Sequence, residues 1–460
     1  MSVLHPDVLT ADTAGALPVR VVVRDAPLNG TEAAWAKAHE FTGKAGQLLI
    51  LPGADGAPAG ALFGAGEGFD PMSVRALAAK LPDGVWRLEG VDGEAAALAA
   101  QAFALGAYRF DRYKTRPGPR PRLAATGAGI GTMLDIAAAC ALAREMVDTP
   151  AGDMGPRQIE TIAREIAEAS GASLTVIAGD QLLDQNYPAV HAVGRAAAPH
   201  RAPRVIEISW NLDRTDLPLV ALVGKGVVFD TGGLDIKPAA GMRNMKKDMG
   251  GAAHALALGR LVMQADLPVR LVVLVAAVEN AISGDAFRPG DILDSRKGLT
   301  IEVGNTDAEG RLILADILTR AGEHAPDVTL DFATLTGAAR IALGPELPPL
   351  YTDDEALAAD LLEASRAVGD PLWRMPLWRG YRPALEAEIA DLRNDPAGWA
   401  QAGSVTAALF LQTFAPTTGA WAHMDIFAWN PRARPGWPEG GEAQGLRSSF
   451  EMLRRRFPAK

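Results

Sequence analysis

From about residue 134 onward, the chain alternates between stretches of helical periodicity and short runs in which almost every residue is apolar and often β-branched. Runs that are apolar at every position predict strands buried on both faces, and helices between them supply the crossovers of a mostly parallel sheet. The predicted helices are Met133–Val147, Pro156–Ala169, Gly250–Gln264, Arg311–Glu323 and Asp354–Val368. The predicted strands are Ser173–Ile177, Val205–Ser209, Leu219–Val223, Val269–Ala277, Leu299–Val303 and Val328–Phe332. Ligands bind outside the carboxyl ends of the strands in such sheets, so chemistry is expected in the loops that follow them.

The first 110 residues or so carry shorter and more mixed patterns. Strand-like runs at Pro18–Val23, Gln47–Leu51 and Ala61–Phe63 are interspersed with Ala-rich helical stretches at Thr31–Phe41 and Val91–Leu105. We therefore predict an α/β protein with two domains. Residues 1–122 would form a small N-terminal α/β domain, and residues 123–460 a larger C-terminal catalytic domain with a mostly parallel central sheet flanked by helices.

Two segments near this predicted boundary need an interpretation. Residues 112–122 contain three prolines and five basic residues, a composition that breaks regular structure and indicates a solvated connector, with a basic partner site as the alternative. Residues 124–131, Ala-Ala-Thr-Gly-Ala-Gly-Ile-Gly, superficially resemble a dinucleotide-binding loop. They lack the third glycine at the required spacing and no apolar strand precedes them, so we do not predict nucleotide binding there.

Charge and hydropathy narrow the class of partner. The 460 residues include 45 Lys plus Arg and 55 Asp plus Glu, a net charge of −10, which disfavours broad nucleic-acid binding and docking on anionic lipid. The N-terminus has acids and prolines where a secretory signal has a basic start and an apolar run. Apolar runs such as Leu271–Val278 are far shorter than the roughly 20 residues needed to span a bilayer. We expect a cytoplasmic protein without a membrane partner.

Cysteine and histidine usage excludes two kinds of metal site. The single cysteine, Cys140, can form neither an intramolecular disulfide nor a thiolate cluster. No two of the seven histidines lie within five residues of each other, which excludes a helical His-x-x-x-His zinc motif. A site built from oxygen ligands stays open. Lysine is scarce, with ten in the chain, yet four of them fall between Lys225 and Lys247.

Charged side chains concentrate in two loops that follow predicted strands and run into helix N-termini. The segment after Val223 contains Lys225, Asp230, Lys237 and Asp248, and the segment after Val303 contains Asp307, Glu309 and Arg311. Taken singly, each acid could be a helix cap or dipole partner, Lys225 a surface lysine, and Arg311 an ordinary partner for Glu309. The coincidence of four acids, two lysines and one arginine at one rim of the sheet favours a functional interpretation.

Four carboxylates brought together would repel one another strongly, so a cation must be present. Hard carboxylate ligands suit Mg²⁺, Mn²⁺ or Zn²⁺, and two ions bridged by carboxylates can bind a bridging hydroxide nucleophile at neutral pH. Lys237 and Arg311 would be neighbouring cations able to stabilise an oxyanion or to hold an anion. These residues alone therefore predict a dinuclear hydrolase.

These segments resemble the leucyl aminopeptidase family, the cytosolic two-metal aminopeptidases that form hexamers. Residues 305–312, Asn-Thr-Asp-Ala-Glu-Gly-Arg-Leu, match the family signature in full, and residues 223–226, 229–233, 236–238 and 245–251 match at the family's spacing. Weaker likeness runs from Gly106 through Glu279-Asn280, Thr334–Gly337 and Ala402–Ala407 to Asp425. The resemblance covers the catalytic domain almost entirely and the first hundred residues hardly at all.

The resemblance implies a role for each matching position and two divalent metal ions per subunit, Mn²⁺ or Zn²⁺. The tighter metal would be held by Lys225, Asp230, Asp248 and Glu309, and the more exchangeable one by Asp230, Asp307 and Glu309. Lys237 would polarise the scissile carbonyl, and Arg311 would hold a bicarbonate ion as general base. The substrate would be a peptide whose free α-amine coordinates the exchangeable metal. Its side-chain pocket would involve Met245, Thr334 and Gly337, with the Leu335 carbonyl facing the substrate backbone. The resemblance also implies a homohexamer.

Three features depart from the family pattern or carry no assigned chemistry. Thr231 and Lys247 are mild departures, where the family commonly has serine and tyrosine or another residue. Phe427, Trp429 and Asn430 stand where the family usually has small residues in the pocket wall, so we hypothesise that a bulky ring narrows or reshapes the pocket and alters the leucine preference. His423 and His254 are interpreted as structural residues, through hydrogen bonding and packing respectively.

Two alternatives to a peptidase remain at this stage. A dinuclear site could act on another substrate such as a phosphoester, although no phosphate-binding loop of the Gly-Lys-Ser/Thr type is present. A non-catalytic DNA-binding or scaffold protein of the same fold is the other alternative, because some family members also bind DNA. The acidic net charge and the intact ligand set make nucleic acid an improbable main partner.

Overall fold

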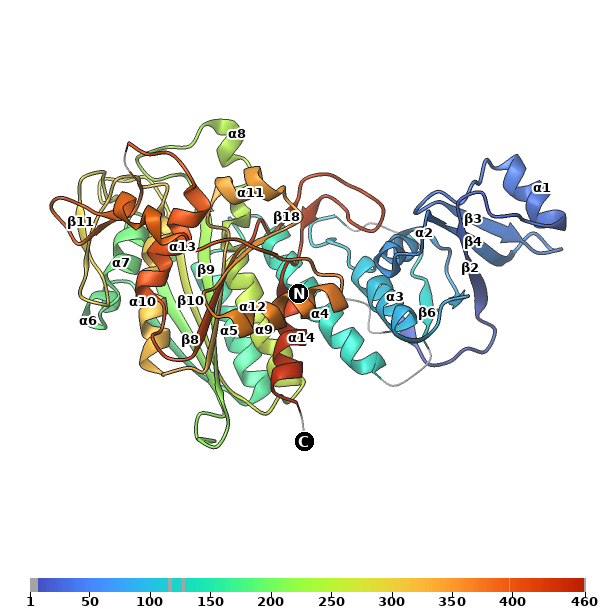
Figure 1. Ribbon diagram of the computed structural model, residues 1–460, viewed down its shortest axis with the longest axis horizontal. Helices are drawn as coiled ribbons and strands as arrows, with labels where there is room; N and C mark the ends of the chain where they lie inside the picture. The colour runs from blue at the N-terminus through green and yellow to red at the C-terminus, as the bar shows by residue number, and fades with distance from the viewer. Residues whose placement is uncertain (1–6, 115–117, 126–128, 397, 459–460) are drawn as a thin grey trace. The chain divides into compact units, whose positions relative to one another are not determined.

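The computed structural model describes residues 7–114, 118–125, 129–396 and 398–458 (Figure 1). The chain divides into two compact units, Met1–Ala141 with Asn430–Glu439, and Leu142–Trp429 with Gly440–Lys460. The domain boundary after residue 122 stays a prediction. Both segments considered near that boundary fall partly outside the described residues, the basic connector at 115–117 and the Gly-rich stretch at 126–128.

The first unit contains a six-stranded sheet in the order β1-β6-β5-β2-β4-β3. All neighbouring strands in it are parallel except β3 and β4, which are antiparallel. The helix α3 buries its alanine-rich C-terminal half, and it packs against the 3-10 turn η1. The elements of the first unit are β1 (Leu9–Thr10), β2 (Leu17–Val23), α1 (Gly30–Ala38), β3 (Leu48–Pro52), β4 (Pro58–Gly66), η1 (Pro71–Ala76), α2 (Leu77–Lys80), β5 (Val85–Glu89), α3 (Gly93–Gly106) and β6 (Arg122–Ala124).

The second unit is built around an eight-stranded sheet in the order β15-β14-β17-β13-β9-β10-β8-β7. Its four middle strands, β17, β13, β9 and β10, are mutually parallel, while β14, β8 and β7 join by antiparallel pairing. The strands are β7 (Ser173–Ala178), β8 (Arg204–Trp210), β9 (Leu219–Asp230), β10 (Arg270–Asn280), β13 (Val328–Ala333), β14 (Pro349–Tyr351), β15 (Trp373–Arg374) and β17 (Ala420–Asp425). The prediction of a mostly parallel sheet flanked by helices is confirmed.

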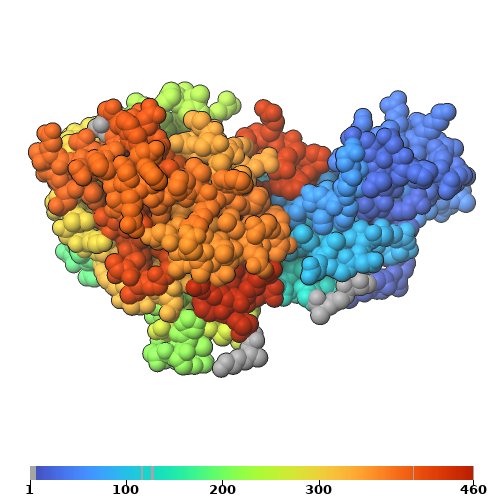
Figure 2. Space-filling model, viewed as in Figure 1, coloured from blue at the N-terminus to red at the C-terminus, as the bar shows by residue number. Residues whose placement is uncertain are grey.

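Helices cover both faces of this sheet. On one face α9 (Gly250–Gln264) packs on β9, β13 and β10, with α5 (Pro156–Ser170) and α14 (Leu446–Arg456) against it. On the other face α10 (Glu309–Glu323) packs on β9 and β10, with α7 (Pro188–Gly194) and α13 (Gly403–Phe414) against it. Figure 2 shows residues of the C-terminal half, drawn in orange, over much of the viewed surface of this unit. In the described residues no helix is long and apolar enough to cross a membrane.

The remaining helical segments of the chain are short or peripheral to this packing. They are α4 (Ile130–Asp148), α6 (Gln181–Asp184), η2 (Pro199–Arg201), α8 (Ala239–Met242), η3 (Met245–Met249), α11 (Gly337–Leu343), α12 (Glu355–Ala367) and η4 (Arg379–Leu385). The smaller strands are β11 (Ile292–Asp294), β12 (Thr300–Glu302), β16 (Leu392–Arg393), β18 (Trp429–Asn430) and β19 (Gly440–Gly441). Of these, η3 and α11 matter most for the site, because they follow the carboxyl ends of β9 and β13.

Two sequence predictions about strands were wrong in ways that affect the site. The strand predicted to end at Val223 continues to Asp230, so Lys225 lies within β9 and not in a loop. The glycines around Lys225 hide this extension from pattern analysis, whereas pairing with β10 continues along it as far as Asp230. Pairing with β13 on the other side ends at Gly224. The strand near residue 300 does not belong to the central sheet. It forms β12 of a separate sheet, in the order β11-β12-β16.

Candidate active site

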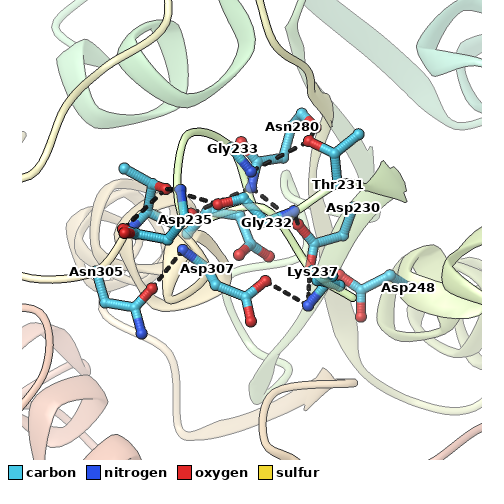
Figure 3. A network of polar contacts seen from close by, with 12 residues as sticks. Asp230, Thr231, Gly232, Gly233, Asp235, Lys237, Asp248, Asn280, Asn305 and Asp307 are labelled. Atoms are coloured by element: carbon cyan, nitrogen blue, oxygen red, sulfur yellow. Dashed lines mark hydrogen bonds and ion pairs between the residues drawn. The ribbon is translucent and has the colours of Figure 1, made fainter. Parts of the chain in front are cut away.

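The four carboxylates predicted to meet do converge, at the carboxyl ends of the parallel strands. Asp230 ends β9, Asp248 lies in η3, Asp307 lies in the turn before α10, and Glu309 is the first residue of α10. Carboxylate oxygens of Asp230, Asp307 and Glu309 all lie within 4.8 Å of one another. Figure 3 shows Asp230, Asp248 and Asp307 together around Lys237. The side chains of Asp230, Asp248 and Glu309 are buried, so their charges are poorly screened by water.

Lys225 lies between two of the buried carboxylates, Asp248 and Glu309. Its Nζ lies 2.7 Å from Oδ2 of Asp248 and 3.0 Å from Oε1 of Glu309, and it donates to the carbonyl of Thr334 at 3.0 Å. A glycine makes this geometry possible. A Cβ at Gly310 would lie 2.6 Å from Cε of Lys225, so the first turn of α10 can carry no side chain where the lysine crosses it. The glycine of the sequence Glu-Gly-Arg at 309–311 therefore leaves the space that Lys225, on β9, occupies.

Lys237 makes the corresponding contacts on the outer side of the cluster. Its Nζ lies 2.7 Å from Oδ2 of Asp230 and also pairs with Asp307. A tight turn after Asp230 brings Lys237 back to the cluster. In this turn Gly232 and Gly233 adopt φ of +87° and +65°, a region that favours glycine. The backbone N–H of Lys237 then donates to the carbonyl of Thr231 at 2.9 Å. The two lysines thus stand between four carboxylates.

Neutral polar side chains hold the loops around Asp230 and Asp307 (Figure 3). The amide of Asn280 donates from Nδ2 to Oδ1 of Asp230 at 2.8 Å and to the carbonyl of Thr306 at 3.1 Å. Thr306 Oγ1 donates to the carbonyl of Gly232 at 2.6 Å, and its N–H donates to Oδ2 of Asp235 at 2.7 Å. These bonds tie the end of β9, the end of β10 and the Asp307 loop into one unit.

The charges shift one another's pKa as expected for a crowded, dry cluster. Burial, followed by the charge of Asp230, raises the pKa of Glu309 to about 8 and that of Asp307 to about 6. Burial alone would lower the pKa of Lys225, but the charges of Asp248 and Glu309 outweigh it and the pKa of Lys225 is raised. The pKa of Lys237 is raised in the same way, with Asp230 as the main opposing charge to burial.

The donor set fits divalent metal ions. Glu309 is 1% exposed; its Oε1 is in ion-pair contact with Lys225 at 3.0 Å, and its Oε2 has no hydrogen-bond partner in the described part of the chain. Such an orphaned buried oxygen is costly unless a cation binds it. Three mutually close carboxylates with a fourth beside them are the hard oxygen ligands that Mn²⁺, Mg²⁺ or Zn²⁺ take. Lys225, from its position between Asp248 and Glu309, can offer nitrogen to the same ion once it loses its proton.

Arg311 lies in the first turn of α10, buried beside the cluster but not paired with it. Its Nη1 donates to the carbonyl of Asn394 at 2.6 Å, and among the described residues it forms no ion pair with Glu309. The alternative that Arg311 is an ordinary partner of Glu309 is therefore wrong. Burial lowers the pKa of Arg311 to about 10. A buried guanidinium without a carboxylate partner is available to hold an anion.

The predicted substrate-binding residues line the same end of the sheet to different degrees. Thr334 follows β13, and its Oγ1 contacts both the carbonyl and Oδ1 of Asp248 at 2.9 Å. Leu335 is held through its N–H, which donates to Oδ1 of Asp425 at 2.9 Å. A Cβ at Gly337 would meet no atom within 4 Å, so the start of α11 faces open space. For Met245 the structure gives its place at the start of η3, three residues before Asp248.

Both histidines interpreted as structural are confirmed in that role. His423 is fully buried in β17, with its Nδ1 2.5 Å from Oδ1 of Asp331. His254 is fully buried in α9, accepts at Nε2 from the N–H of Gln444 at 2.9 Å, and contacts the carbonyl of Gly250 through Nδ1 at 2.6 Å. Since Nε2 accepts, Nδ1 carries the proton. Neither ring contacts the carboxylate cluster.

Sequence reasoning missed three supporting residues. Asn280 and Asp425 lie in segments that resemble the family, and their positions directly after buried apolar runs could have drawn attention to them. Asp425 accepts from the N–H groups of Leu335 and Thr336 and from the Thr336 hydroxyl. Asn394 lies in a segment without apolar periodicity, and nothing in the sequence connects it with residues 304–311.

Comparison with known proteins identifies the family. A family model described as "Cytosol aminopeptidase family, catalytic domain" matches residues 141–449, which include every predicted site residue. The chain belongs to this family. A second model, "M17 aminopeptidase, N-terminal domain", matches residues 23–125, so the expectation that the first hundred residues hardly resemble the family was wrong. The protein is therefore an exopeptidase of the leucyl aminopeptidase type, from a family of metal-dependent aminopeptidases.

Similar proteins extend this likeness over nearly the whole chain. A probable cytosol aminopeptidase from Syntrophotalea carbinolica is 37% identical, covering 93% of this chain and 92% of the relative. The crystal structure of the cytosol aminopeptidase from Coxiella burnetii has a TM-score of 0.91 and 42% identity, with 98% and 99% of the two chains covered. The bottromycin maturation enzyme BotP in complex with Mn has a TM-score of 0.86 and 33% identity, with 96% and 99% covered.

Proposed function

We propose that this aminopeptidase removes the N-terminal residue from peptides with a free α-amine, using two divalent metal ions per subunit. The observation that carries the proposal is the buried cluster in which carboxylate oxygens of Asp230, Asp307 and Glu309 lie within 4.8 Å of one another. Two divalent ions supply, when bound, a water of lowered pKa as nucleophile and a Lewis acid for the scissile carbonyl. The structure of a relative in complex with Mn supports Mn²⁺, with Zn²⁺ as the alternative.

Each residue of the cluster has a proposed part in holding these ions. Lys225, Asp230, Asp248 and Glu309 would hold the tighter ion, and Asp230, Asp307 and Glu309 the more exchangeable one. Lys225 would have to lose its proton, a change that a neighbouring dication favours. The carboxylates of Asp230 and Glu309 would belong to both ions, which agrees with their place in the middle of the cluster.

Other residues would orient the substrate and move protons. Lys237, on the outer side of the cluster, would donate to the carbonyl oxygen as negative charge develops on it. Arg311, which has no carboxylate partner among the described residues, would hold a bicarbonate ion as general base. The carbonyl of Leu335 would accept from the substrate backbone, because Asp425 fixes this segment through the N–H groups of Leu335 and Thr336.

We further propose that the pocket departs from a simple leucine preference. Phe427 is half-buried, with Nζ of Lys247 4.9 Å and Cζ of Arg340 5.3 Å from its ring centre, so cations hold the ring in place. In the same way, Nζ of Lys246 lies over the ring of Trp429, 5.3 Å from its centre. A held ring leaves less room beside Met245 and Gly337 than a small residue would. A panel of aminoacyl-anilides should show altered preference, and unmodified leucine preference would contradict this part.

The decisive experiment compares hydrolysis of leucyl peptides with free and acetylated N-termini, each with and without a chelator. We expect cleavage of the free peptide alone, its loss on chelation, and its recovery with added Mn²⁺. Cleavage of the acetylated peptide would contradict the amine requirement. Activity that survives complete metal removal would contradict the metal mechanism. A phosphoester as substrate is tested in the same assay with p-nitrophenyl phosphate, for which we expect no turnover.

The cellular location and the oligomeric state of the protein are also proposals. The name that the relatives carry, cytosol aminopeptidase, supports a cytoplasmic location. The resemblance to the family supports a homohexamer, which light scattering would detect as six times the 48.3 kDa of one chain. The net charge of −10 supports peptides rather than nucleic acid as partners. Retention of unrelated duplex DNA in a gel-shift experiment at physiological salt would contradict that view.

A further inference from the structure

Asn394 is a fully buried amide far along the chain from the carboxylate cluster. It follows the two-residue strand β16, which pairs in parallel with β12 through Ile301 and Leu392. The N–H of Asn394 extends that pairing by donating to the carbonyl of Glu302 at 3.0 Å. The small sheet thus brings Asn394 beside the turn that leads from β12 into α10, although about 90 residues separate them.

The side chain of Asn394 makes four hydrogen bonds to that turn. Its Oδ1 accepts from the N–H of Gly304 at 2.9 Å and from the N–H of Asn305 at 3.3 Å. Its Nδ2 donates to the carbonyl of Asn305 at 2.7 Å and to the carbonyl of Ala308 at 3.3 Å. Because the bonds span residues 304–308, they enclose Asp307 on both sides.

The main chain of Asn394 contacts a second functional group. Its carbonyl accepts from Nη1 of Arg311 at 2.6 Å. The neighbouring Asp395 approaches the same turn so closely that a Cβ on Gly304 would lie 1.9 Å from its Oδ1. One buried residue therefore contacts both the turn that carries Asp307 and the guanidinium of Arg311.

We propose that Asn394 is a positioning residue that preorganises the Asp307 turn and Arg311 for the reaction. The proposal rests on the proposed function for the roles of Asp307 and Arg311. Groups that orient metal ligands by hydrogen bonding typically change metal affinity or activity by roughly 10- to 100-fold when removed. A residue that only fills space would have no such effect when replaced by a side chain of the same size.

The first test uses the unchanged protein and hydrogen–deuterium exchange. If Asn394 holds the turn, the amides of Gly304 and Asn305 are protected before any metal is added, and Mn²⁺ changes their exchange rates by less than tenfold. A gain in protection of more than tenfold on adding Mn²⁺ would overturn the proposal, since the metal would then be what orders the turn. This result does not depend on peptidase activity.

The second test measures Mn²⁺ binding by calorimetry for Asn394→Ala and Asn394→Leu. Both variants lose all four side-chain bonds, while leucine keeps the volume, so we expect both to weaken binding of the exchangeable ion by about 10- to 100-fold. The matched control is Asp370→Ala. Asp370 is a buried side chain that accepts from the N–H groups of Gly445, Arg447 and Ser448, and in the described part of the chain it does not contact the carboxylate cluster.

The outcomes separate positioning from general stabilisation. Wild-type Mn²⁺ affinity in Asn394→Leu would overturn the proposal, as would an equal loss of affinity in Asp370→Ala. Circular dichroism establishes that each variant is folded at the temperature used, and if neither Asn394 variant folds, the exchange experiment decides alone. If the unchanged protein binds no Mn²⁺, the proposed function fails, whereas the exchange rates still decide whether Asn394 holds the turn.

Discussion

Glu309 is the residue on which the proposed metal site depends most. It is buried beside Asp230 and Asp307, its Oε1 pairs with Lys225, and its Oε2 has no hydrogen-bond partner among the described residues. We expect Glu309→Ala to abolish peptidase activity and to reduce bound metal, measured by turnover and by elemental analysis, with an unchanged circular dichroism spectrum. The fold should survive, because alanine removes a group whose burial is unfavourable without a cation. Glu165→Ala, an exposed acid on α5, is the control. Activity retained in the presence of Mn²⁺ would contradict the assignment.

Lys237 should behave differently, because its proposed partner is the substrate carbonyl rather than a metal. Its ammonium lies on the outer side of the cluster, against Asp230 and Asp307. We expect Lys237→Ala to lower turnover by about 10² to 10³, the usual effect of losing one oxyanion donor, with both metals still bound. Turnover and metal content measured on the same preparation test this. A drop to one metal per subunit would show that Lys237 supports metal binding instead.

At the scale of elements, the site depends on how closely α10 approaches β9. Gly310→Ala would place a Cβ 2.6 Å from Cε of Lys225, and the flexible lysine would give way more easily than the helix. We expect activity to fall at least tenfold in a peptide-hydrolysis assay while the melting temperature changes little. Gly322→Ala is the matched control on the same helix, because its Cβ would meet its nearest neighbour, Pro416, at 3.4 Å. Equal activity in the two variants would contradict the steric argument.

At the scale of the whole molecule, His254 links stability to pH. Burial lowers its pKa from 6.5 to about 4, so the folded protein keeps the ring neutral while the unfolded chain binds a proton. The free energy of unfolding therefore decreases as the pH falls from 6.5, the pKa of the ring in the unfolded chain, to about 4, its pKa in the folded protein. By linkage, this histidine should remove about 2 kcal/mol of unfolding free energy between pH 7 and pH 5. In His254→Gln, which can form similar hydrogen bonds, urea unfolding at the two pH values should show a smaller difference. An unchanged difference would contradict this role.

The sequence by itself determined the fold class, most of the elements and the chemistry of the cluster. Hydrophobic periodicity depends on local chain geometry, so the helix predicted at Gly250–Gln264 has the observed limits, and five of the six predicted strands overlap strands of the central sheet. The signature at residues 305–312 indicated the type of site through its resemblance to the leucyl aminopeptidase family.

Tertiary structure alone decided the features that depend on partners distant in the sequence. The strand β9 continues past Lys225 because β10 pairs with it there, although the glycines beside the lysine weaken the local pattern. Arg311 donates to the carbonyl of Asn394, a residue 83 positions further along the chain. Asn394 itself acquires its four bonds only when β16 pairs with β12. Periodicity records which face of an element is buried, and it holds no information about which polar groups meet there.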